Sequence, residues 1–409
     1  MRFEHRAIPI VLAAVVVDVI GLGIVMPVLP ALVTHLGRMD LAQATRVSGW
    51  LLAVFAIGQF VAGPILGNLG DRFGRRPVLM ASMVAFSLDY LLMAAAPTLA
   101  WLFVGRAIAG VAGATFGPAG AVIADTTPAD RRGPIFGLLG AAFGVGFILG
   151  PALGGIAAGW GTRAPFVVAA ALAALNAVAM ALFLPETLAP ENRRPFRLRD
   201  AHVVDAFKPL FAAGNATPLL VAWFLWQLGN TVYPATWSFW AAIRFGWNAT
   251  AIGWSLAWVG FLSVVVQVGL TRRVLARVGE RNAAVIGLFS ATATLIAYAF
   301  TTQGWQVYAF FLLGCLGAFA YPAMNATLSR MVDATRQGAL QGGIGSMNSV
   351  AAILGPLIAA QSLGWGAAHG FDGAAFMVAA ALIGSAASII WLRVPTASPA
   401  PESPAAISR

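Results

Sequence analysis

Long apolar stretches separated by short polar ones dominate the pattern of this chain. Each stretch is long enough to cross a bilayer as a helix, which takes about 20 residues. The pattern therefore predicts an all-α polytopic membrane protein with twelve transmembrane helices in two six-helix halves. The predicted spans are residues 7–30, 47–67, 77–96, 99–124, 134–158, 164–184, 216–240, 249–270, 282–302, 305–329, 339–362 and 372–393.

Polar segments divide the chain into four regions. Residues 1–184 are the expected N-terminal six-helix half and residues 214–393 the C-terminal half. The segment 185–213 between them contains prolines and basic residues and is expected to be a cytoplasmic linker. Residues 394–409 are rich in Pro, Ser and Ala, which predicts a disordered cytoplasmic tail.

The two halves carry the same pattern at a fixed spacing. Several pairs of residues are each separated by 205 positions, the difference between their two residue numbers. One offset across separate loops and helices indicates a parallel repeat, in which two halves are related by an axis along the membrane normal. The pairs are Gly74 with Gly279, Arg131 with Arg336, Gly133 with Gly338, and Gly150-Pro151 with Gly355-Pro356.

Composition and charge fit the membrane interpretation and exclude others. Hydrophobic residues make up 59% of the chain and charged residues 10%, too few charges for a soluble domain, in which about 25% is usual. The net charge of +10 does not indicate nucleic-acid binding, because most of the basic residues fall in every second loop and at the termini. By the positive-inside rule, this asymmetry predicts a polytopic protein with both termini in the cytoplasm, and we expect a bacterial inner membrane as its location.

A charged, glycine-containing hairpin joins the second and third predicted spans. Its pattern G-x-x-x-D-R-x-G-R-R resembles the signature loop of the major facilitator superfamily, which implies the twelve-helix facilitator fold. We expect this hairpin to act in gating, by contacting the start of the eleventh helix near Gly338 and the acid Asp125 that closes the fourth span; a solvated loop acid is the alternative for Asp125. The matching residues are Gly67, Asp71, Arg72, Gly74, Arg75 and Arg76.

Two intramembrane helices carry small residues at helical spacing. In the fifth span, the sequence 144–155 resembles the antiporter motif of exporters in this superfamily, and we count Gly150 and Pro151 as gating residues. In the fourth span, Arg106 shares one predicted helical stripe with Gly110, Gly113 and Gly117. This stripe resembles the superfamily's arginine motif and predicts that Arg106 points inward.

Only two carboxylates lie inside the predicted spans and away from their ends, Asp18 and Asp89. A buried acid must pair, reach water or take up a proton, so each is a candidate for proton coupling, with a purely structural hydrogen bond as the alternative. Asp18 is the stronger candidate because of its depth and the nearby Gly21, Gly23 and Pro27. Arg106 is expected to act on Asp18 differently in the two gate states.

Together these motifs resemble the tetracycline-efflux branch of the drug–proton antiporters over nearly the whole chain. Further matching segments are Asp18 through Pro30, Asp89-Tyr90 and Leu184-Pro-Glu-Thr187. The resemblance implies functional roles for Asp18, Gln59, Asp71, Asp89 and Arg106. The chain departs from that family at two positions: Ser263 stands where the family has a histidine in the eighth helix, and Ala291 where it has an aspartate in the ninth.

Uncharged polar and aromatic side chains gather in the C-terminal spans. They suit a flat, largely neutral ligand, so we expect the C-terminal half to supply most substrate contacts. With Gln59, the candidate substrate-binding residues are Trp226, Gln227, Asn230, Trp258, Ser263, Gln267, Tyr321, Asn325, Gln341 and Asn348.

These features predict a proton-coupled secondary transporter that exports a small amphiphilic drug-like compound by alternating access. An exporter of an endogenous metabolite or sugar is the alternative, and a transporter-like scaffold or sensor is a third possibility. The loops show no nucleophile–base set or metal-ligand spacing, so we expect no enzyme, cofactor or metal site. The expected partners are the substrate, protons and the lipid bilayer, without nucleic acid, and the protein is expected to function as a monomer.

Overall fold

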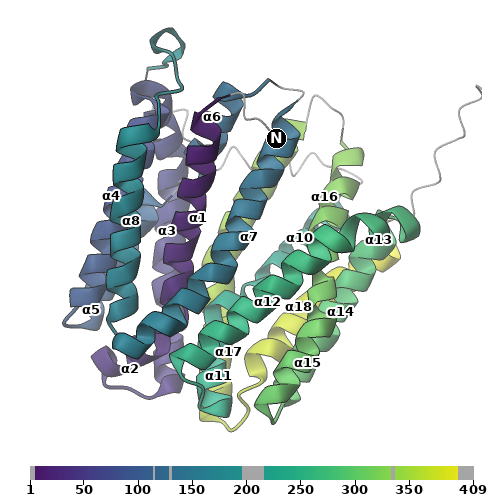
Figure 1. The fold of residues 1–409 in the computed structure, drawn as a ribbon. Coiled ribbons are helices and arrows are strands. Elements are labelled where there is room, and N and C mark those ends of the chain that lie inside the picture. Colours follow the sequence, from purple (N-terminus) through teal and green to yellow (C-terminus); the bar gives the residue numbers. More distant parts are fainter. Residues whose placement is uncertain (1–4, 114–115, 129–130, 196–215, 333–336, 395–409) are drawn as a thin grey trace, which may run out of the picture.

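The computed structural model of the chain describes residues 5–113, 116–128, 131–195, 216–332 and 337–394. Within these residues the chain forms helices and no strand. The helices gather into two bundles side by side, one from purple to teal and the other from green to yellow (Figure 1). Most of the predicted linker, residues 196–213, and the tail beyond Val394 lie outside the described residues.

The N-terminal bundle follows the predicted spans with changes at their ends. The helix α3 has 33 residues and runs beyond the predicted span 47–67 at both ends. At its C-terminal end it continues into the hairpin. The elements are α1 (Ala7–Val25), α2 (Leu29–Gly37), α3 (Leu41–Phe73), α4 (Arg75–Ala95), α5 (Leu99–Ala112), α6 (Phe116–Thr126), α7 (Arg132–Ala157), α8 (Ala164–Phe183) and the 3₁₀ turns η2 (Ala158–Trp160) and η3 (Pro190–Asn192).

The C-terminal bundle repeats this plan. Its eleventh predicted span is also too short at 339–362, since α17 has 32 residues. The elements are α10 (Thr217–Asn230), α11 (Val232–Phe245), α12 (Ala249–Gly269), α13 (Thr271–Val278), α14 (Glu280–Phe300), α15 (Gly304–Gly314), the 3₁₀ segment η7 (Cys315–Phe319), α16 (Ala320–Arg330), α17 (Gln337–Ala368) and α18 (Ala374–Arg393).

Eleven helical stretches among the described residues are long and apolar enough to cross a membrane. The remaining predicted span is the seventh along the chain, residues 216–240. It is divided at Thr231 into α10 and α11, each of 14 residues. Neither piece alone has spanning length, but together they cover residues 217–245. The chain is therefore an all-helical, multi-pass membrane protein.

Four of the predicted spans are interrupted. One interruption lies near the end of the first span, at residues 26–28, and the other three lie farther inside their spans, at Gly113, at Thr231 and at the 3₁₀ segment Cys315–Phe319. In the fourth span α5 ends at Ala112 and Gly117 belongs to α6, so the residues of the predicted stripe are divided between two helices. In transporters, discontinuous helices of this kind border substrate and ion sites.

The repeat offset of 205 is visible in the helix boundaries. Both α4 and α14 have 21 residues, and their first residues, Arg75 and Glu280, are 205 positions apart. Each helix follows a glycine with positive φ, 107° at Gly74 and 79° at Gly279. Since this backbone conformation strains residues with a β-carbon, both turns depend on glycine.

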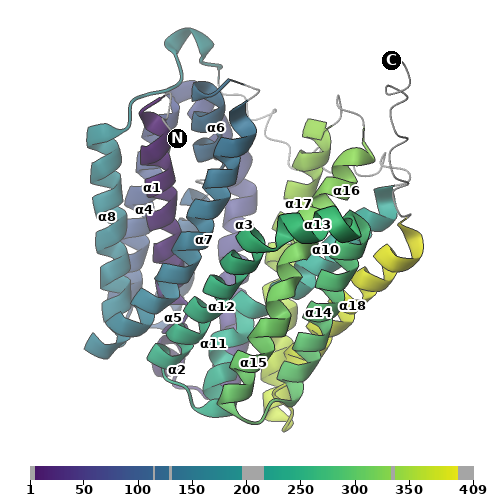
Figure 2. The ribbon, with the colours of Figure 1, turned by 45° about the vertical axis from the view of Figure 1, so that its right-hand side comes forward.

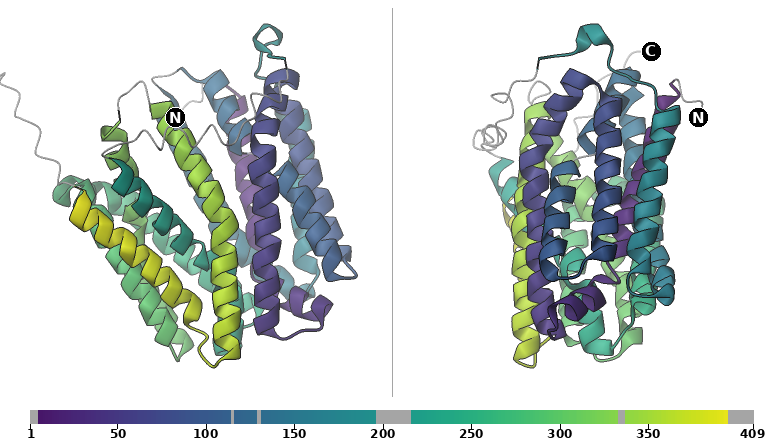
Figure 3. Two further views of the ribbon diagram at one scale, coloured as in Figure 1. Left: turned by 180° about the vertical axis from the view of Figure 1, so that it is seen from behind. Right: turned by 90° about the vertical axis from the view of Figure 1, so that its left-hand side faces the viewer.

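Among the described residues, the two halves contact each other toward one end of the molecule and along the middle of α7 and α12. We call the end carrying Gly74 the hairpin end and the opposite end the far end. Toward the far end, α3 contacts α17 where Gly49 lies against Ala360, and α7 contacts α12 where Gly155 lies against Thr250. Toward the hairpin end, Gly67 of α3 and Gly342 of α17 have open space beside them, and the helices diverge (Figures 2 and 3).

Candidate functional site

The first group of candidate residues is the hairpin, where α3 passes into α4 through Gly74. Its tight turn leaves the first backbone N–H groups of α4 without helical acceptors. The Glu186 carboxylate, from the segment after α8, accepts from Arg75 N at 2.9 Å and from Arg76 N at 3.2 Å. A β-carbon on Gly74 would collide with that carboxylate. Gly74 is therefore required both for its backbone conformation and for the approach of Glu186.

An ion-pair chain connects the hairpin to the end of α6. Arg75 Nη1 lies 2.6 Å from Asp71 Oδ1, and its Nε lies 3.1 Å from Asp125 Oδ2. The Arg75 side chain is 12% exposed, against 35% for Asp71 and 22% for Asp125. The structure thus places Asp125 on the hairpin, as the sequence predicts. Gly338 lies outside the residues whose surroundings the structure describes.

The other hairpin residues lie around this chain. The Arg72 guanidinium stacks over the Phe73 ring at 5.0 Å and is exposed. Arg76 donates from its Nη2 to the carbonyl of Ala181 in α8. Gly67 faces open space on the side of α3. The hairpin is thus held to α8 and to the end of α6 within the N-terminal half.

The C-terminal half contains the same ion pair with its charges reversed. Glu280 Oε1 lies 2.7 Å from Arg330 Nη2. These two residues stand 205 positions after Arg75 and Asp125, respectively. The position equivalent to Asp71 is Ala276, so the third member of the N-terminal chain has no carboxylate counterpart.

A second equivalence concerns the turns that precede α7 and α17. Arg132 donates to the carbonyls of Ala124 at 2.8 Å and Thr127 at 3.0 Å. Gln337, 205 positions later, donates to the carbonyls of Ser329 and Val332, which are again 205 positions later. Both side chains bridge the end of one helix to the start of the next.

Gly150 and Pro151 lie where α7 packs against its neighbours. A β-carbon on Gly150 would come within 2.8 Å of Gly23 Cα in α1, and Gly253 of α12 packs against the Pro151 carbonyl. The equivalent Gly355 of α17 packs against the Thr231 side chain at the break between α10 and α11. Each glycine thus permits close approach of a neighbouring helix beside an interrupted span.

A buried ion pair lies inside the N-terminal half. Arg106 Nη2 of α5 binds Asp89 Oδ2 of α4, with the side chains 9% and 0% exposed. The guanidinium also donates to Met93 Sδ at 3.0 Å and lies 5.6 Å from the Phe55 ring centroid. Arg106 therefore points inward, as its stripe predicts, but the ion pair that it forms is with Asp89, whereas the sequence analysis expected it to act on Asp18.

Asp18 lies midway along α1 and is 8% exposed. It lines a very small cavity of about 10 Å³ inside the N-terminal half, with apolar neighbours that include Leu79, Met83 and Ala119. The Tyr90 ring lies one turn away, against Gly21, and its hydroxyl is buried without a hydrogen-bond partner. Asp18 is thus a buried carboxyl group one helical turn from the residue that packs against the buried Tyr90 ring.

Gln59 stabilises the interruption of the fourth span. Its Nε2 donates to the Gly113 carbonyl at 3.0 Å, just where α5 ends. Gly110 packs against the backbone of Phe55 on α3, which brings the two helices close enough for this bond. Gln59 thus satisfies a carbonyl group that the helix break leaves without a helical donor.

Aromatic and amide side chains form a cluster on α10, α16 and α17. The Trp223 and Trp226 ring centroids lie 5.3 and 6.2 Å from that of Tyr321. Trp223 Nε1 donates to Asn348 Oδ1 at 2.9 Å. Both tryptophans are buried, whereas Tyr321 is 49% exposed. The exposed face of Tyr321 is thus available for contact with a ligand.

Two further amides extend this cluster toward the hairpin end. Gln341 Nε2 of α17 donates to Asn325 Oδ1 of α16 at 3.0 Å. On α10, Gln227 is half-buried and Asn230 is exposed beside the helix break. The structure therefore brings together candidates that the sequence places on three different spans.

The candidates on α12 are not joined to this cluster by the described contacts. Trp258 is 42% exposed and stacks on Phe261 of the same helix at 5.8 Å. Ser263 donates to the Val259 carbonyl at 2.8 Å, and Gln267 is exposed. The polar group that replaces the family's histidine thus bonds within its own helix.

Two residues of the site were not among the predicted ones. Glu186 was noted only as part of the segment Leu184-Pro-Glu-Thr187, and its distance of 111 positions from Arg75 hides the contact. Trp223 stands three residues before Trp226 in the sequence, and its apolar surroundings gave no sign of the bond to Asn348. A carboxylate directly after a span is the one signal that could have pointed to Glu186.

Comparison with known proteins agrees with this architecture. The family model described as Major Facilitator Superfamily matches residues 11–356 and 231–407. The chain is 39% identical to the class C tetracycline resistance protein of Escherichia coli, over 93% of this chain and 95% of that protein. It is also 39% identical to the class G tetracycline resistance protein of Vibrio anguillarum, over 85% and 88% of the two chains.

Solved structures share the fold at lower sequence identity. The human organic anion transporter MFSD10 (TETRAN) superposes with a TM-score of 0.71 at 22% identity, covering 95% of this chain and 100% of that one. The family match, the relatives and the fold all agree with the predicted resemblance. The chain therefore belongs to the Major Facilitator Superfamily and is a membrane transporter, not an enzyme.

Proposed function

We propose that this protein exports a small amphiphilic drug-like compound from a bacterial cell in exchange for protons. The observation that carries this proposal is the identity of 39% to a tetracycline resistance protein over nearly the full length of both chains. The interrupted spans and the buried acids supply what such a transporter needs, a path through the bundle and groups that can carry protons.

The hairpin end is assigned to the cytoplasm. Basic residues concentrate at this end, in the hairpin and in α13, as the positive-inside rule requires. Both termini then lie in the cytoplasm, and residues 185–213 are the cytoplasmic linker between the halves at 1–184 and 214–393. The halves diverge at this end and meet at the far end, so the conformation is open toward the cytoplasm.

In this mechanism the hairpin stabilises the other conformation of the transporter, in which the cytoplasmic side is closed. When the hairpin ends of the halves approach, Asp71 and its neighbouring arginines come toward the start of α17 and favour closure on the cytoplasmic side. The ion pairs of Arg75 with Asp71 and Asp125 position these charges. Substrate binding and protonation then act by shifting the balance between the two conformations.

Substrate and proton sites are assigned to different halves. The cluster around Tyr321, with Gln227, Asn230 and the amides of α16 and α17, contacts the substrate. Asp18 carries the proton, because an intramembrane carboxyl group at this depth is a candidate to take up and release a proton during the cycle. The pair of Asp89 and Arg106 holds α4 and α5 together.

Export of an endogenous metabolite or sugar is the second candidate. It is favoured by the two departures from the efflux family, Ser263 and Ala291, which remove a histidine and an aspartate from the C-terminal half. An uncharged cluster of indole, phenol and amide groups also suits a neutral polar ligand. The monomer is taken as the working unit for either substrate.

A susceptibility panel in an efflux-deficient bacterial host separates these functions. Expression of the chain should raise the inhibitory concentration of at least one amphiphilic compound, and collapse of the proton gradient should abolish the effect. The control is Asp71→Asn expressed at equal level. Binding without counterflow in proteoliposomes would instead indicate a sensor, and resistance to no compound, with export of a metabolite, would favour the second candidate.

A further inference from the structure

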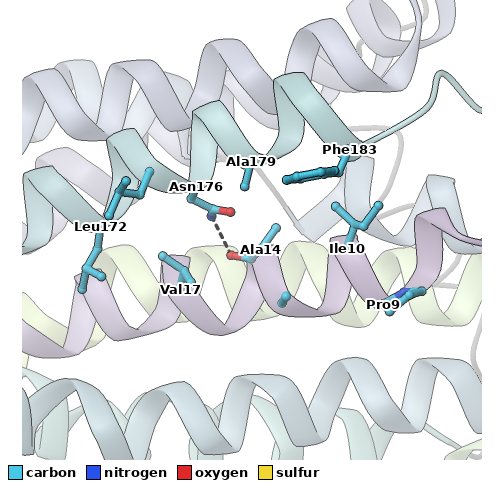
Figure 4. Close-up of a pocket in the computed structure, with 10 residues that line it drawn as sticks. Pro9, Ile10, Ala14, Val17, Leu172, Asn176, Ala179 and Phe183 are labelled. Atoms are coloured by element: carbon cyan, nitrogen blue, oxygen red, sulfur yellow. Dashed lines mark hydrogen bonds between the residues drawn. The ribbon is translucent and has the colours of Figure 1, made fainter.

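An apolar groove runs along the outside of the N-terminal half between α1 and α8. It has a volume of about 440 Å³, and Figure 4 shows α1 and α8 bordering it. Leu175 and Phe183 are each 65% exposed, so the groove opens toward the lipid. Its lining includes Pro9, Ile10, Ala13, Val17, Leu172 and Phe183.

The polar group in this groove is already satisfied. Asn176 Nδ2 donates to the Ala14 carbonyl at 2.9 Å (Figure 4) and to Met83 Sδ at 3.3 Å. The groove therefore offers apolar surface and little polar recognition along its length, which suits a hydrocarbon chain.

The groove continues into a basic hollow at the hairpin end. This second hollow has a volume of about 370 Å³ and is lined by Arg6 and Arg76. Ile10 and Phe183 line both hollows, so the two form one continuous surface. Arg76 Nε is buried without a hydrogen-bond partner, and Arg6 is exposed. The Arg76 Nε donor and the Arg6 guanidinium thus lie at the hairpin end of the apolar groove.

We propose that this surface binds one anionic phospholipid from the cytoplasmic leaflet. An acyl chain occupies the groove between α1 and α8, and the phosphate lies between Arg6 and Arg76. Charge complementarity selects this occupant, since basic pockets between helices on the cytoplasmic side bind anionic headgroups. The site is separate from the proposed substrate cluster in the other half, and its occupancy does not depend on which compound is exported.

Binding at this place also reaches the hairpin. The backbone N–H of Arg76 donates to Glu186 and its guanidinium donates to Ala181 in α8. A phosphate on the same guanidinium therefore adds to the contacts that fix the hairpin on the N-terminal half. Anionic lipid is thus expected to raise the fraction of protein in one gate conformation.

Photo-crosslinking tests the proposal in the full-length protein. The protein is placed in phosphatidylcholine nanodiscs that contain a small fraction of phosphatidylglycerol or phosphatidylcholine with a photoreactive acyl chain. Cross-links are mapped by peptide mass spectrometry. The phosphatidylglycerol probe should label residues 9–17 and 172–183 several-fold more than the phosphatidylcholine probe does.

Three variants sharpen this test. Arg6→Gln should reduce the preference for phosphatidylglycerol about five-fold, the factor that one basic residue at a membrane surface contributes. Arg272→Gln removes an exposed arginine of α13 at the same end of the protein and should leave the preference unchanged. Ala13→Trp fills the groove and should reduce labelling of both segments.

Two results would overturn the assignment. Equal labelling by the two probes would mean that the groove holds ordinary surrounding lipid without headgroup selection. Displacement of both probes by an exported drug would instead identify the groove as a substrate entry.

Discussion

Glu186 accepts hydrogen bonds from the first two backbone N–H groups of α4, and the nearer one, from Arg75, measures 2.9 Å. The two residues lie 111 positions apart, so the segment after α8 caps the start of α4, the third span. A carboxylate at a helix N-terminus is favoured both by these bonds and by the helix dipole.

Removing this cap should weaken the N-terminal half. Glu186→Ala leaves the two N–H groups of α4 and those of Thr187 and Leu188 without their acceptor. Loss of the helix cap alone should lower the free energy of unfolding by about 0.5–2 kcal/mol and reduce transport. Thermal unfolding in detergent and drug susceptibility measure the two effects. Glu191→Ala, at an exposed residue of the turn Pro190–Asn192, is the control. An unfolding temperature as high as that of the control would contradict the capping role.

The hairpin carboxylate should matter for gating more than for folding. Asp71→Asn breaks a partly exposed ion pair, which contributes only about 0–1 kcal/mol to stability. We expect nearly normal expression and substrate binding but impaired transport, measured by binding and uptake on the same membrane preparation. Glu280→Gln breaks the charge-reversed pair in the other half and serves as the comparison. Loss of folded protein in proportion to loss of transport would reduce Asp71 to a folding role.

Proton coupling should depend on Asp18. Asp18→Asn keeps the size of the side chain but cannot gain or lose a proton, so proton-driven efflux should stop while substrate exchange down a gradient continues. Substrate-induced proton release in proteoliposomes is the measurement. Undiminished proton release from this variant would exclude Asp18 and move attention to Asp89.

Asp89 should behave differently because it pairs with a buried cation. Asp89→Asn leaves Arg106 without its partner, and breaking such a pair typically costs about 3–5 kcal/mol. We expect little folded protein, and recovery of folded protein in the double variant Asp89→Asn/Arg106→Gln, measured by monodispersity and thermal unfolding. A well-folded single variant would show that the ion pair is not structural.

Substrate affinity should depend on the amides near Tyr321. Gln227→Ala and Asn325→Ala each remove hydrogen-bonding capacity, which should weaken binding roughly two- to tenfold for a bond contributing 0.5–1.5 kcal/mol. Equilibrium binding to purified protein gives the dissociation constants. Gln267→Ala on α12 is the matched amide control and should bind normally. If only the control lost affinity, the pocket would have to lie along α12.

The sequence was sufficient to predict the membrane spans and the two related halves, because these features depend on patterns that extend over the whole chain. Spanning lengths, the offset of 205 and the alternation of basic loops each involve many residues, so single exceptions do not hide them. The hairpin pattern identified Asp71 and Gly74, and the placing of Asp125 beside Arg75 agrees with the structure.

Local interruptions were not visible in hydropathy. Gly113, where α5 ends, is as small as its neighbours, and its carbonyl group is bound by the amide of Gln59 from another helix. The division at Thr231 likewise depends on the close approach of Gly355. Arg106 pairs with Asp89 because of the way α4 and α5 pack together. The spacing of residues along the chain does not show this packing, so the sequence predicted an effect on Asp18 instead.

Arg132 and Gln337 reach equivalent carbonyl groups although one is a cation and the other is neutral. The two halves therefore share, at this position, the capacity to donate two hydrogen bonds to equivalent carbonyl groups, and they do not share the charge of the donor. A search for ancient duplications in such proteins gains power when residues are compared by donor capacity, since identity alone scores this pair as unrelated.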